Sequence, residues 1–187
     1  MSEIVSEAKK ALRVQILANR TDVLAKQTSG QFAESLLALS LKQNLKRIGC
    51  YLSFGSEPAT DSFIELAKAE GMEIACPRID SNGQMVMAVL DSGTTLSALG
   101  FREPAGKVIE PKDLELIVVP ALAIDYKGQR LGRGAGYFDR YLEHYKGPTV
   151  GLVYDLEFLP EVPSLSHDKP VSQVVTEART IGIPFAR

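Results

Sequence analysis

The chain has 187 residues, 45% of them hydrophobic and 24% charged, which is the composition of one globular domain spanning residues 1–187. Its 21 lysines and arginines against 23 acidic residues leave a net charge of −2, so no nucleic-acid partner is expected. The longest apolar run, Leu116–Ile124, is too short to span a bilayer, and the charged N-terminus is not a signal peptide. We therefore expect a cytoplasmic protein with no membrane attachment.

Few residues are available for zinc binding or for a serine nucleophile. The chain has two histidines, His144 and His167, and no cysteine pair at metal-ligand spacing, which argues against a zinc site. It contains no G-x-S-x-G motif, so a serine hydrolase of the α/β type is not expected. Cys50 and Cys76 lie far apart in strand-like segments, and we expect them to be reduced, structural thiols.

Residues 2–27 are predicted to form a helix, because they contain no glycine or proline and carry an apolar residue at every fourth position from 4 to 16. A neighbouring face of this helix carries three basic residues, Lys9, Arg13 and Arg20. A face of this kind is most often solvated, and ligand binding is the less common alternative. A second helix is predicted from residue 31 to about residue 42.

The segment 47–53 is predicted to be a buried strand that leads into a turn and then a helix over 61–70. Glu57 lies in that turn. In open α/β sheets, ligands bind at the carboxyl ends of parallel strands, so Glu57 is a candidate site residue. The alternative is a surface acid placed before Pro58 without a chemical role.

The middle of the chain is predicted to contain two short strands and a long excursion. The strands are 73–76, closed by Pro77 and Arg78, and 84–90, entered through a turn at 81–83. Residues 91–112 are rich in glycine and proline, and we expect a surface segment with one helical turn near 96–99. Additional antiparallel strand pairing within 91–111 is the alternative that we consider for this segment.

A strand over 114–119 is followed by the most distinctive stretch of the chain, Gly128–Arg140, which holds four glycines and three arginines. Aromatic and aliphatic residues at helical spacing follow from residue 137. Glycines allow positive φ angles and close approach of a ligand to the backbone. A helix N-terminus and arginine side chains both suit phosphate or carboxylate oxygens.

The spacing of this stretch excludes two common phosphate-binding motifs. Tyr137 stands where G-x-G-x-x-G requires its third glycine, and the chain contains no G-x-x-x-x-G-K-[ST]. A phosphate site remains the favoured interpretation, and a tight turn with solvated arginines is the alternative. Asp139 is expected to cap the helix, pair with an arginine or hold Mg²⁺. The carboxylates considered for Mg²⁺ are Glu57, Asp125, Asp139 and Asp168.

The C-terminal part is predicted to hold a strand over 149–154, a proline-rich loop over 160–170 and short strands over 171–175 and 180–183. Strands that alternate with helices predict an α/β fold. The expected architecture is a single three-layer α/β/α domain with a mainly parallel, Rossmann-like open sheet.

Four segments, in the same order as in the family, resemble the 5-formyltetrahydrofolate cyclo-ligases, which are also called methenyltetrahydrofolate synthetases. Residues 9–13 resemble a K-x-x-L-R helix, and residues 51–60 resemble a Y-L-S…E…T turn. Residues 130–140 resemble the signature R-L-G-x-G-x-G-Y-Y-D-R, and residues 167–176 resemble a D…V-x-T-E segment. The signature is the most specific of the four.

The resemblance implies conversion of 5-formyltetrahydrofolate and ATP to 5,10-methenyltetrahydrofolate, ADP and phosphate with Mg²⁺. Contacts with ATP would come from Lys9, Lys10, Arg13, Arg130, Leu131, Gly132, Arg133, Gly134, Ala135, Gly136, Tyr137 and Phe138. Contacts with the folate would come from Leu52, Glu57, Arg133, Gly134, Ala135, Gly136 and Tyr137. Catalytic roles would fall to Glu57, Arg133 and Tyr137, and Mg²⁺ would be held by Asp139 and Asp168.

Two positions of the signature depart from the family. Phe138 replaces the usual second tyrosine, and Ala135 stands where some members carry a lysine. Glu57 would either accept hydrogen bonds from the pterin or steer a proton at N10. The alternatives to the enzyme are a non-catalytic folate- or nucleotide-binding module and a sugar-phosphate isomerase on a related scaffold. We expect a monomer or a weak homo-oligomer.

Overall fold

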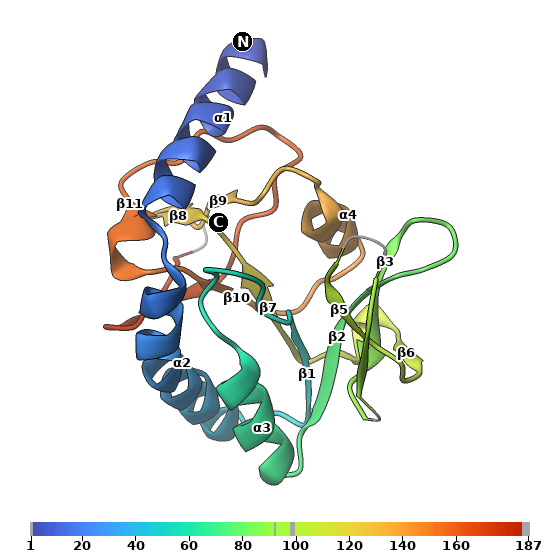
Figure 1. Cartoon of the computed structure of the whole chain (residues 1–187). Helices are drawn as coiled ribbons and strands as arrows, with labels where there is room; N and C mark the ends of the chain where they lie inside the picture. The colour runs from blue at the N-terminus through green and yellow to red at the C-terminus, as the bar shows by residue number, and fades with distance from the viewer. Residues whose placement is uncertain (1, 92, 98–99, 185–187) are drawn as a thin grey trace.

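The computed structural model describes residues 2–91, 93–97 and 100–184, and within these ranges an eight-stranded sheet has helices on both faces (Figure 1). In spatial order its strands are β13 (Thr180–Gly182), β12 (Gln173–Val175), β10 (Thr149–Leu152), β7 (Leu116–Pro120), β1 (Arg47–Cys50), β2 (Glu73–Ile79), β3 (Met85–Val89) and β6 (Val108–Ile109). The central strands from β12 to β2 are parallel, and β13, β3 and β6 are antiparallel to their neighbours. This confirms the mainly parallel sheet predicted from the sequence.

Helices α2 (Asp22–Lys42) and α3 (Asp61–Ala69) cover one face of this sheet, and α4 (Tyr137–Glu143) covers the other (Figure 1). Successive side chains of β7 serve the two faces in turn. Leu116 and Val118 pack in the core under α2 and α3, and Ile117 and Val119 pack in the core under α4. A strand buried on both faces is apolar throughout, and this is the pattern from which the strand over 114–119 was predicted.

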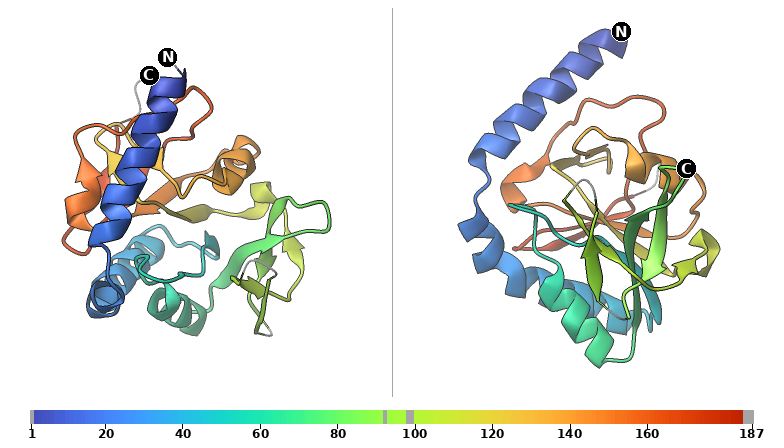
Figure 2. Two further views of the ribbon diagram at one scale, coloured as in Figure 1. Left: turned by 45° about the horizontal axis from the view of Figure 1, so that its top comes forward. Right: turned by 45° about the vertical axis from the view of Figure 1, so that its right-hand side comes forward.

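Helix α1 (Ser2–Asn19) lies against a smaller three-stranded sheet of β11 (Phe158–Leu159), β8 (Ala123–Asp125) and β9 (Arg130–Leu131). Leu12 and Ile16 pack there against Leu122, Leu131 and Val162. The N-terminal part of α1 extends beyond the body of the molecule, as the two views of Figure 2 show. Among the described residues, no helix combines the length and the apolar character needed to cross a membrane.

The helices at the N-terminus divide at a different place from the one predicted. The expected helices over 2–27 and 31–42 are instead α1 and α2, which are separated at Arg20 and Thr21. Thr21 caps α2, because its side chain accepts a hydrogen bond of 3.2 Å from the backbone N–H of Leu24. Gly30 lies inside α2 on its exposed side, where a glycine weakens a helix without ending it.

Strand β1 is shorter than the predicted strand 47–53, and β2 is longer than 73–76. After Cys50, the Thr60 hydroxyl donates to the carbonyl of Tyr51 over 2.7 Å, so side-chain bonds replace the strand ladder. Pro77 continues β2 because β1 pairs only as far as Ala75. Beyond that point no β1 carbonyl needs the N–H group that proline lacks.

The excursion over 91–112 contains antiparallel strand pairs, which confirms the alternative that we considered for this segment. Strands β4 (Thr94–Leu96) and β5 (Arg102–Pro104) form a hairpin, and β6 pairs with β3. Pro111–Asp113 forms a 3₁₀ turn before β7. The predicted helical turn near 96–99 is wrong at Leu96, which belongs to β4, and residues 98 and 99 lie outside the described residues.

Candidate active site

A cavity of about 960 Å³ opens at the carboxyl ends of β1, β2 and β7. Its walls come from α1, the turn after β1, the loop between β9 and α4, the β4–β5 hairpin and the segment around Asp168. This is the position at which parallel sheets bind ligands, because the loops after the strands gather there. The site predicted from separate sequence motifs is therefore one place in the structure.

Most of the predicted site residues line this cavity. They are Lys9, Arg13, Leu52, Glu57, Arg130, Gly132, Arg133, Gly134, Ala135, Gly136, Tyr137, Phe138, Asp139 and Asp168. Lys10 and Leu131 lie outside the lining. Lys10 is on the exposed side of α1, and the Leu131 side chain is buried in the core beneath that helix.

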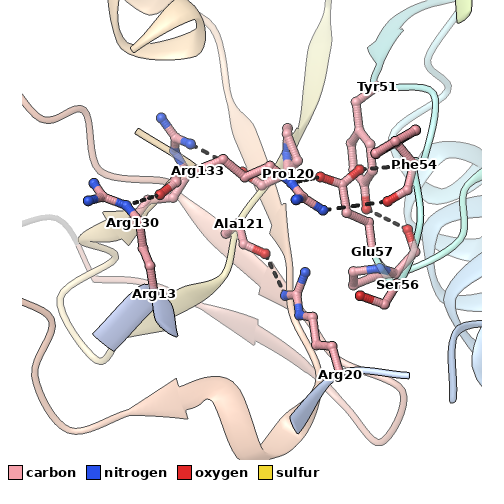
Figure 3. A network of polar contacts seen from close by, with 12 residues as sticks. Arg13, Arg20, Tyr51, Phe54, Ser56, Glu57, Pro120, Ala121, Arg130 and Arg133 are labelled. Carbon is pink, nitrogen blue, oxygen red and sulfur yellow. Dashed lines mark hydrogen bonds and ion pairs between the residues drawn. The ribbon is translucent and has the colours of Figure 1, made fainter. Parts of the chain in front are cut away.

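The basic face of α1 is turned into the protein. Lys9 is 7% exposed and pairs with Asp168, which lies 159 residues away in the chain. The Nε of Arg13 donates to the carbonyl of Gly132 over 2.9 Å (Figure 3). The expectation of a solvated face is therefore wrong for Lys9 and for Arg20, which is also buried.

Glu57 and Arg133 form an ion pair across the cavity. Glu57 is 7% exposed, and its Oε1 accepts a hydrogen bond of 2.7 Å from Nε of Arg133 (Figure 3). Its Oε2 accepts the backbone N–H of Phe54 over 3.0 Å. The alternative of a surface acid without a partner is therefore wrong for Glu57. The pair joins the turn after β1 to the loop over residues 132–136 between β9 and α4, which we call the signature loop.

Arg130 is buried beneath the signature loop. Its Nη2 donates to Oδ1 of Asp139 over 2.7 Å, and its Nη1 donates to the carbonyl of Pro120 over 3.1 Å. The pair with Arg130 is one of the three roles expected for Asp139. The Arg130 guanidinium thereby ties the loop and the start of α4 to the end of β7.

The signature loop turns at glycines that no other residue replaces without strain. Gly134 has φ of 110°, and Gly136, which caps α4, has φ of 70°. A side chain at Gly136 would also place its Cβ 2.9 Å from Nη1 of Arg140. These two positions confirm the positive φ angles expected from the sequence.

Two carboxylates predicted as metal ligands lie at the edge of the same cavity. Asp168 accepts hydrogen bonds at Oδ2 from Lys9 and from the Leu165 N–H, and its Oδ1 is 4.0 Å from His167. Burial raises the pKa of Asp168, but Lys9 and the Leu165 N–H outweigh it, and the pKa lies below its usual value. The carboxylate is therefore ionised at neutral pH.

The third carboxylate considered, Asp125, has a structural role instead. Its Oδ1 accepts the N–H groups of Lys127 and Gln129 over 2.8 and 2.9 Å, and its Oδ2 accepts the N–H of Val162 over 3.1 Å. The first two bonds close the β8–β9 turn, and the third holds the segment after β11 against it. Asp125 lies outside the described lining of the cavity.

One wall of the cavity was missed in the sequence. Phe54 and Phe101 meet edge to face with ring centroids 5.1 Å apart, and Arg102 beside them forms a two-bond pair with Asp61. Arg78 at the end of β2 also lines this side. For Phe101 and Arg102, the only sign of a role in the site was the length of the excursion over 91–112 in which they lie. Their residue types alone do not indicate a binding site.

Comparisons with known proteins agree with this geometry. The profile of the 5-formyltetrahydrofolate cyclo-ligase family matches residues 5–177. A 5-formyltetrahydrofolate cyclo-ligase of Mycolicibacterium smegmatis is 33% identical, over 93% of this chain and 96% of the relative. One from Mus musculus is 28% identical, over 92% and 95%.

Solved structures show the same fold. The NMR structure of Aquifex aeolicus 5,10-methenyltetrahydrofolate synthetase is 26% identical and superposes with a TM-score of 0.84, covering 98% of this chain and 95% of the other. A synthetase from Mycoplasma pneumoniae, 22% identical, superposes with a TM-score of 0.73 over 90% and 98%. The profile covers nearly the whole chain and every segment that forms the cavity. The chain belongs to the 5-formyltetrahydrofolate cyclo-ligase family.

Proposed function

We propose that this chain is an ATP-dependent 5-formyltetrahydrofolate cyclo-ligase that works as one domain. It converts 5-formyltetrahydrofolate and ATP to 5,10-methenyltetrahydrofolate, ADP and phosphate. The observation that carries the proposal is the meeting of distant segments at one cavity. Lys9 pairs with Asp168, Arg13 with Gly132 and Glu57 with Arg133, so the motif segments of the family form a single site.

The chemistry requires activation of a poor leaving group. Transfer of the γ-phosphoryl group of ATP to the formyl oxygen releases ADP and leaves an electrophilic carbon bound to N5. N10 then attacks that carbon, the C–O bond breaks, phosphate leaves, and the N10 proton passes to solvent or to a nearby base. Phosphoryl transfer depends mainly on positioning and on neutralisation of charge.

Side chains around the cavity divide into a phosphate side and a folate side in this proposal. Lys9, Arg13 and the backbone of residues 132–136 face the phosphates of ATP, whereas Lys10, on the exposed side of α1, is not given a role. The folate side carries Leu52, Tyr137 and the Glu57–Arg133 pair. The guanidinium of that pair suits the charge that develops on the formyl oxygen, and the carboxylate suits the amino edge of the pterin.

The residues present fit a magnesium ion at Asp139 and Asp168. Each carboxylate uses one oxygen for its basic partner: Oδ1 of Asp139 accepts from Arg130 and from the Lys169 N–H, and Oδ2 of Asp168 accepts from Lys9 and from the Leu165 N–H. Magnesium takes one or two protein carboxylates and completes its shell with water and phosphate oxygens. When bound, it would neutralise charge on the phosphates of ATP.

The direct test is to incubate the purified protein with 5-formyltetrahydrofolate, ATP and Mg²⁺ and to follow the ultraviolet absorbance of the methenyl product. We expect product with the wild type and a large loss of turnover in Arg133→Ala and Asp139→Asn. Arg47→Ala is the control, because Arg47 pairs with Glu73 away from the cavity. Tight folate binding without product or ATP consumption would replace the enzyme with a binding module.

A further inference from the structure

The basic side chains that line the cavity differ in whether an acid neutralises them. Four of them have a carboxylate partner within 4.0 Å, namely Lys9, Arg102, Arg130 and Arg133. Among the described residues, no carboxylate lies within ion-pair distance of the other three, Arg13, Arg78 and Arg140. An arginine that stands at a cavity wall without an acid keeps its full charge for an anionic ligand.

Arg140 is the last residue of the signature segment 130–140 and lies in the middle of α4. Its side chain reaches back, and Nη1 donates to the carbonyl of Ala135 over 3.1 Å. Its guanidinium carbon lies 5.0 Å from the centre of the Tyr137 ring. Only Nη1 is used in these contacts, so the remaining N–H groups of an exposed guanidinium are free for a ligand.

Arg13 and Arg140 contact the same loop at neighbouring residues. Arg13 binds the carbonyl of Gly132 and lies within 3.5 Å of the Cβ position at Gly134, whereas Arg140 binds at Ala135 and lies beside Gly136. Two unneutralised guanidinium groups thus border the backbone that the proposed function assigns to phosphate. Ala135 itself brings no charge to the loop.

We propose that Arg140 is a further ligand of the ATP polyphosphate, for which no role follows from the family resemblance. The inference rests on the proposed function for the identity of the nucleotide. Arg78 is the less suitable candidate, because its Nη1 is shared between the carbonyls of Pro104 and Gly106 on the hairpin side of the cavity. The hairpin side of the cavity is also far from Arg13, because helix α1, which carries Arg13, and strand β5 of the hairpin lie on opposite sides of the molecule in Figure 1 and in the left view of Figure 2.

A purely structural role is the competing explanation, since the bond to Ala135 and the contact with Tyr137 would also hold the loop in shape. Glutamine separates the two roles. The Arg140→Gln side chain removes the charge and carries its N–H donor two bonds nearer the backbone than Nη1, so the thermal midpoint of this variant reports any loss of the bond to Ala135. A ligand role requires the charge, and a structural role requires the donor.

The test is calorimetric titration of ATP, AMP and 5-formyltetrahydrofolate into the wild type and into Arg140→Ala, Arg140→Gln and Arg140→Lys. We expect both neutral variants to bind ATP about tenfold more weakly, which is the effect of one charged hydrogen bond. Affinity for 5-formyltetrahydrofolate and the thermal midpoint should stay unchanged, and the loss should be smaller for AMP. Lysine should restore most of the affinity for ATP.

Arg179→Gln is the control, because Arg179 is also an exposed arginine over an aromatic ring, that of Phe158, but it pairs with Asp155 and lies outside the cavity lining. It should bind ATP as the wild type does. The double variant Ala135→Lys with Arg140→Ala should regain affinity for ATP, since its ammonium group arises from the same part of the loop.

Wild-type affinity for ATP in Arg140→Gln would overturn the inference and leave Arg140 with a structural role. An equal loss for AMP and ATP, or a loss that extends to the folate, would also contradict it. The proposed function fails separately. A protein that binds ATP through Arg140 but forms no methenyl product refutes the reaction alone, and a wild type that binds no ATP refutes both.

Discussion

Glu57 shows how much one side chain organises at this site. Its two oxygens join the Phe54 N–H, on the turn after β1, to Arg133 in the signature loop. Arg133 also donates to the Phe54 carbonyl over 3.5 Å. Because Glu57 and Arg133 are 76 residues apart in the sequence, the carboxylate links two distant segments of the cavity wall.

We predict that Glu57→Ala lowers kcat/KM for 5-formyltetrahydrofolate by about 100-fold, because the Phe54 N–H and the Arg133 guanidinium both lose their partner. Glu57→Gln keeps an acceptor for one of these donors and should lose about tenfold. Initial rates over a range of folate concentrations at saturating ATP measure both effects. Wild-type kinetics in Glu57→Ala would remove this residue from the site.

Cys50 and Cys76 are both buried as free thiols in the sheet, as expected from the sequence. Burial raises the pKa of Cys76 to about 12 and raises the pKa of Cys50 well above its usual value. The thiolate is the reactive form, so we predict that a thiol reagent at pH 8 modifies neither cysteine in the native protein. Both should react at once after unfolding in urea, and fast labelling of the folded chain would contradict this.

At the scale of elements, the junction between α1 and α2 is fixed by a buried ion pair. Arg20 donates to both oxygens of Glu157 over 2.7 and 2.6 Å and to the carbonyl of Ala121 over 2.7 Å. Figure 3 shows Arg20 pointing at Ala121, beside the Pro120 carbonyl that binds Arg130. The bond from Arg20 to the Ala121 carbonyl therefore ties the end of α1, the helix that carries Lys9 and Arg13, to the end of β7.

We predict that Arg20→Met lowers the free energy of unfolding by about 3–5 kcal/mol, because Glu157 is left buried without its partner. Burial already raises the pKa of the Glu157 carboxyl, although Arg20 acts in the opposite direction. Arg20→Met combined with Glu157→Leu should recover much of the loss, since neither charge is then buried. Urea unfolding curves measure both, and a double variant no more stable than Arg20→Met would contradict this account.

The β4–β5 hairpin is held to α3 by Arg102 and Asp61, and this link should depend on pH. Hydrogen bonds from Arg102 lower the pKa of Asp61. A carboxyl with a lowered pKa adds stability above its unfolded pKa of about 3.9, and this is lost as the pH falls through the folded pKa.

We therefore predict that Arg102→Leu lowers the thermal midpoint at pH 6 but that its difference from the wild type shrinks as the pH approaches about 3. The effect should stay below about 1 kcal/mol, because both side chains are more than one third exposed. Thermal unfolding of the two proteins across this pH range measures it. A difference that is constant with pH would show that Arg102 acts by packing and not by its charge.

For the molecule as a whole, the class of fold and the sheet were predictable from the sequence, because the spacing of apolar residues depends directly on which side chains are buried. Strand β7 and the amphipathic α3 were close to their predicted bounds. The predicted α1–α2 boundary was wrong because the capping residue Thr21 was overlooked. The bond from Arg20 to Glu157 that holds this junction joins residues 137 apart, and no local pattern encodes it. The same reason explains why Phe101 and Arg102 were missed at the site.

The candidate site was predictable where the residue types themselves indicate which ligand they bind. Glycines, arginines and acids after strands predicted an anion site, and the family resemblance grouped four segments that the fold then brought together. The pairing among them was not predictable, because Lys9 with Asp168 and Glu57 with Arg133 are products of the tertiary fold.

The central claim is that one site couples consumption of ATP to closure of the folate ring. It is tested most directly by measuring ADP and methenyl product together in one reaction with 5-formyltetrahydrofolate, ATP and Mg²⁺. We predict equal amounts of the two products, and neither of them when ATP or the folate is omitted. Methenyl product without ADP, or ADP released without methenyl product, would contradict the account.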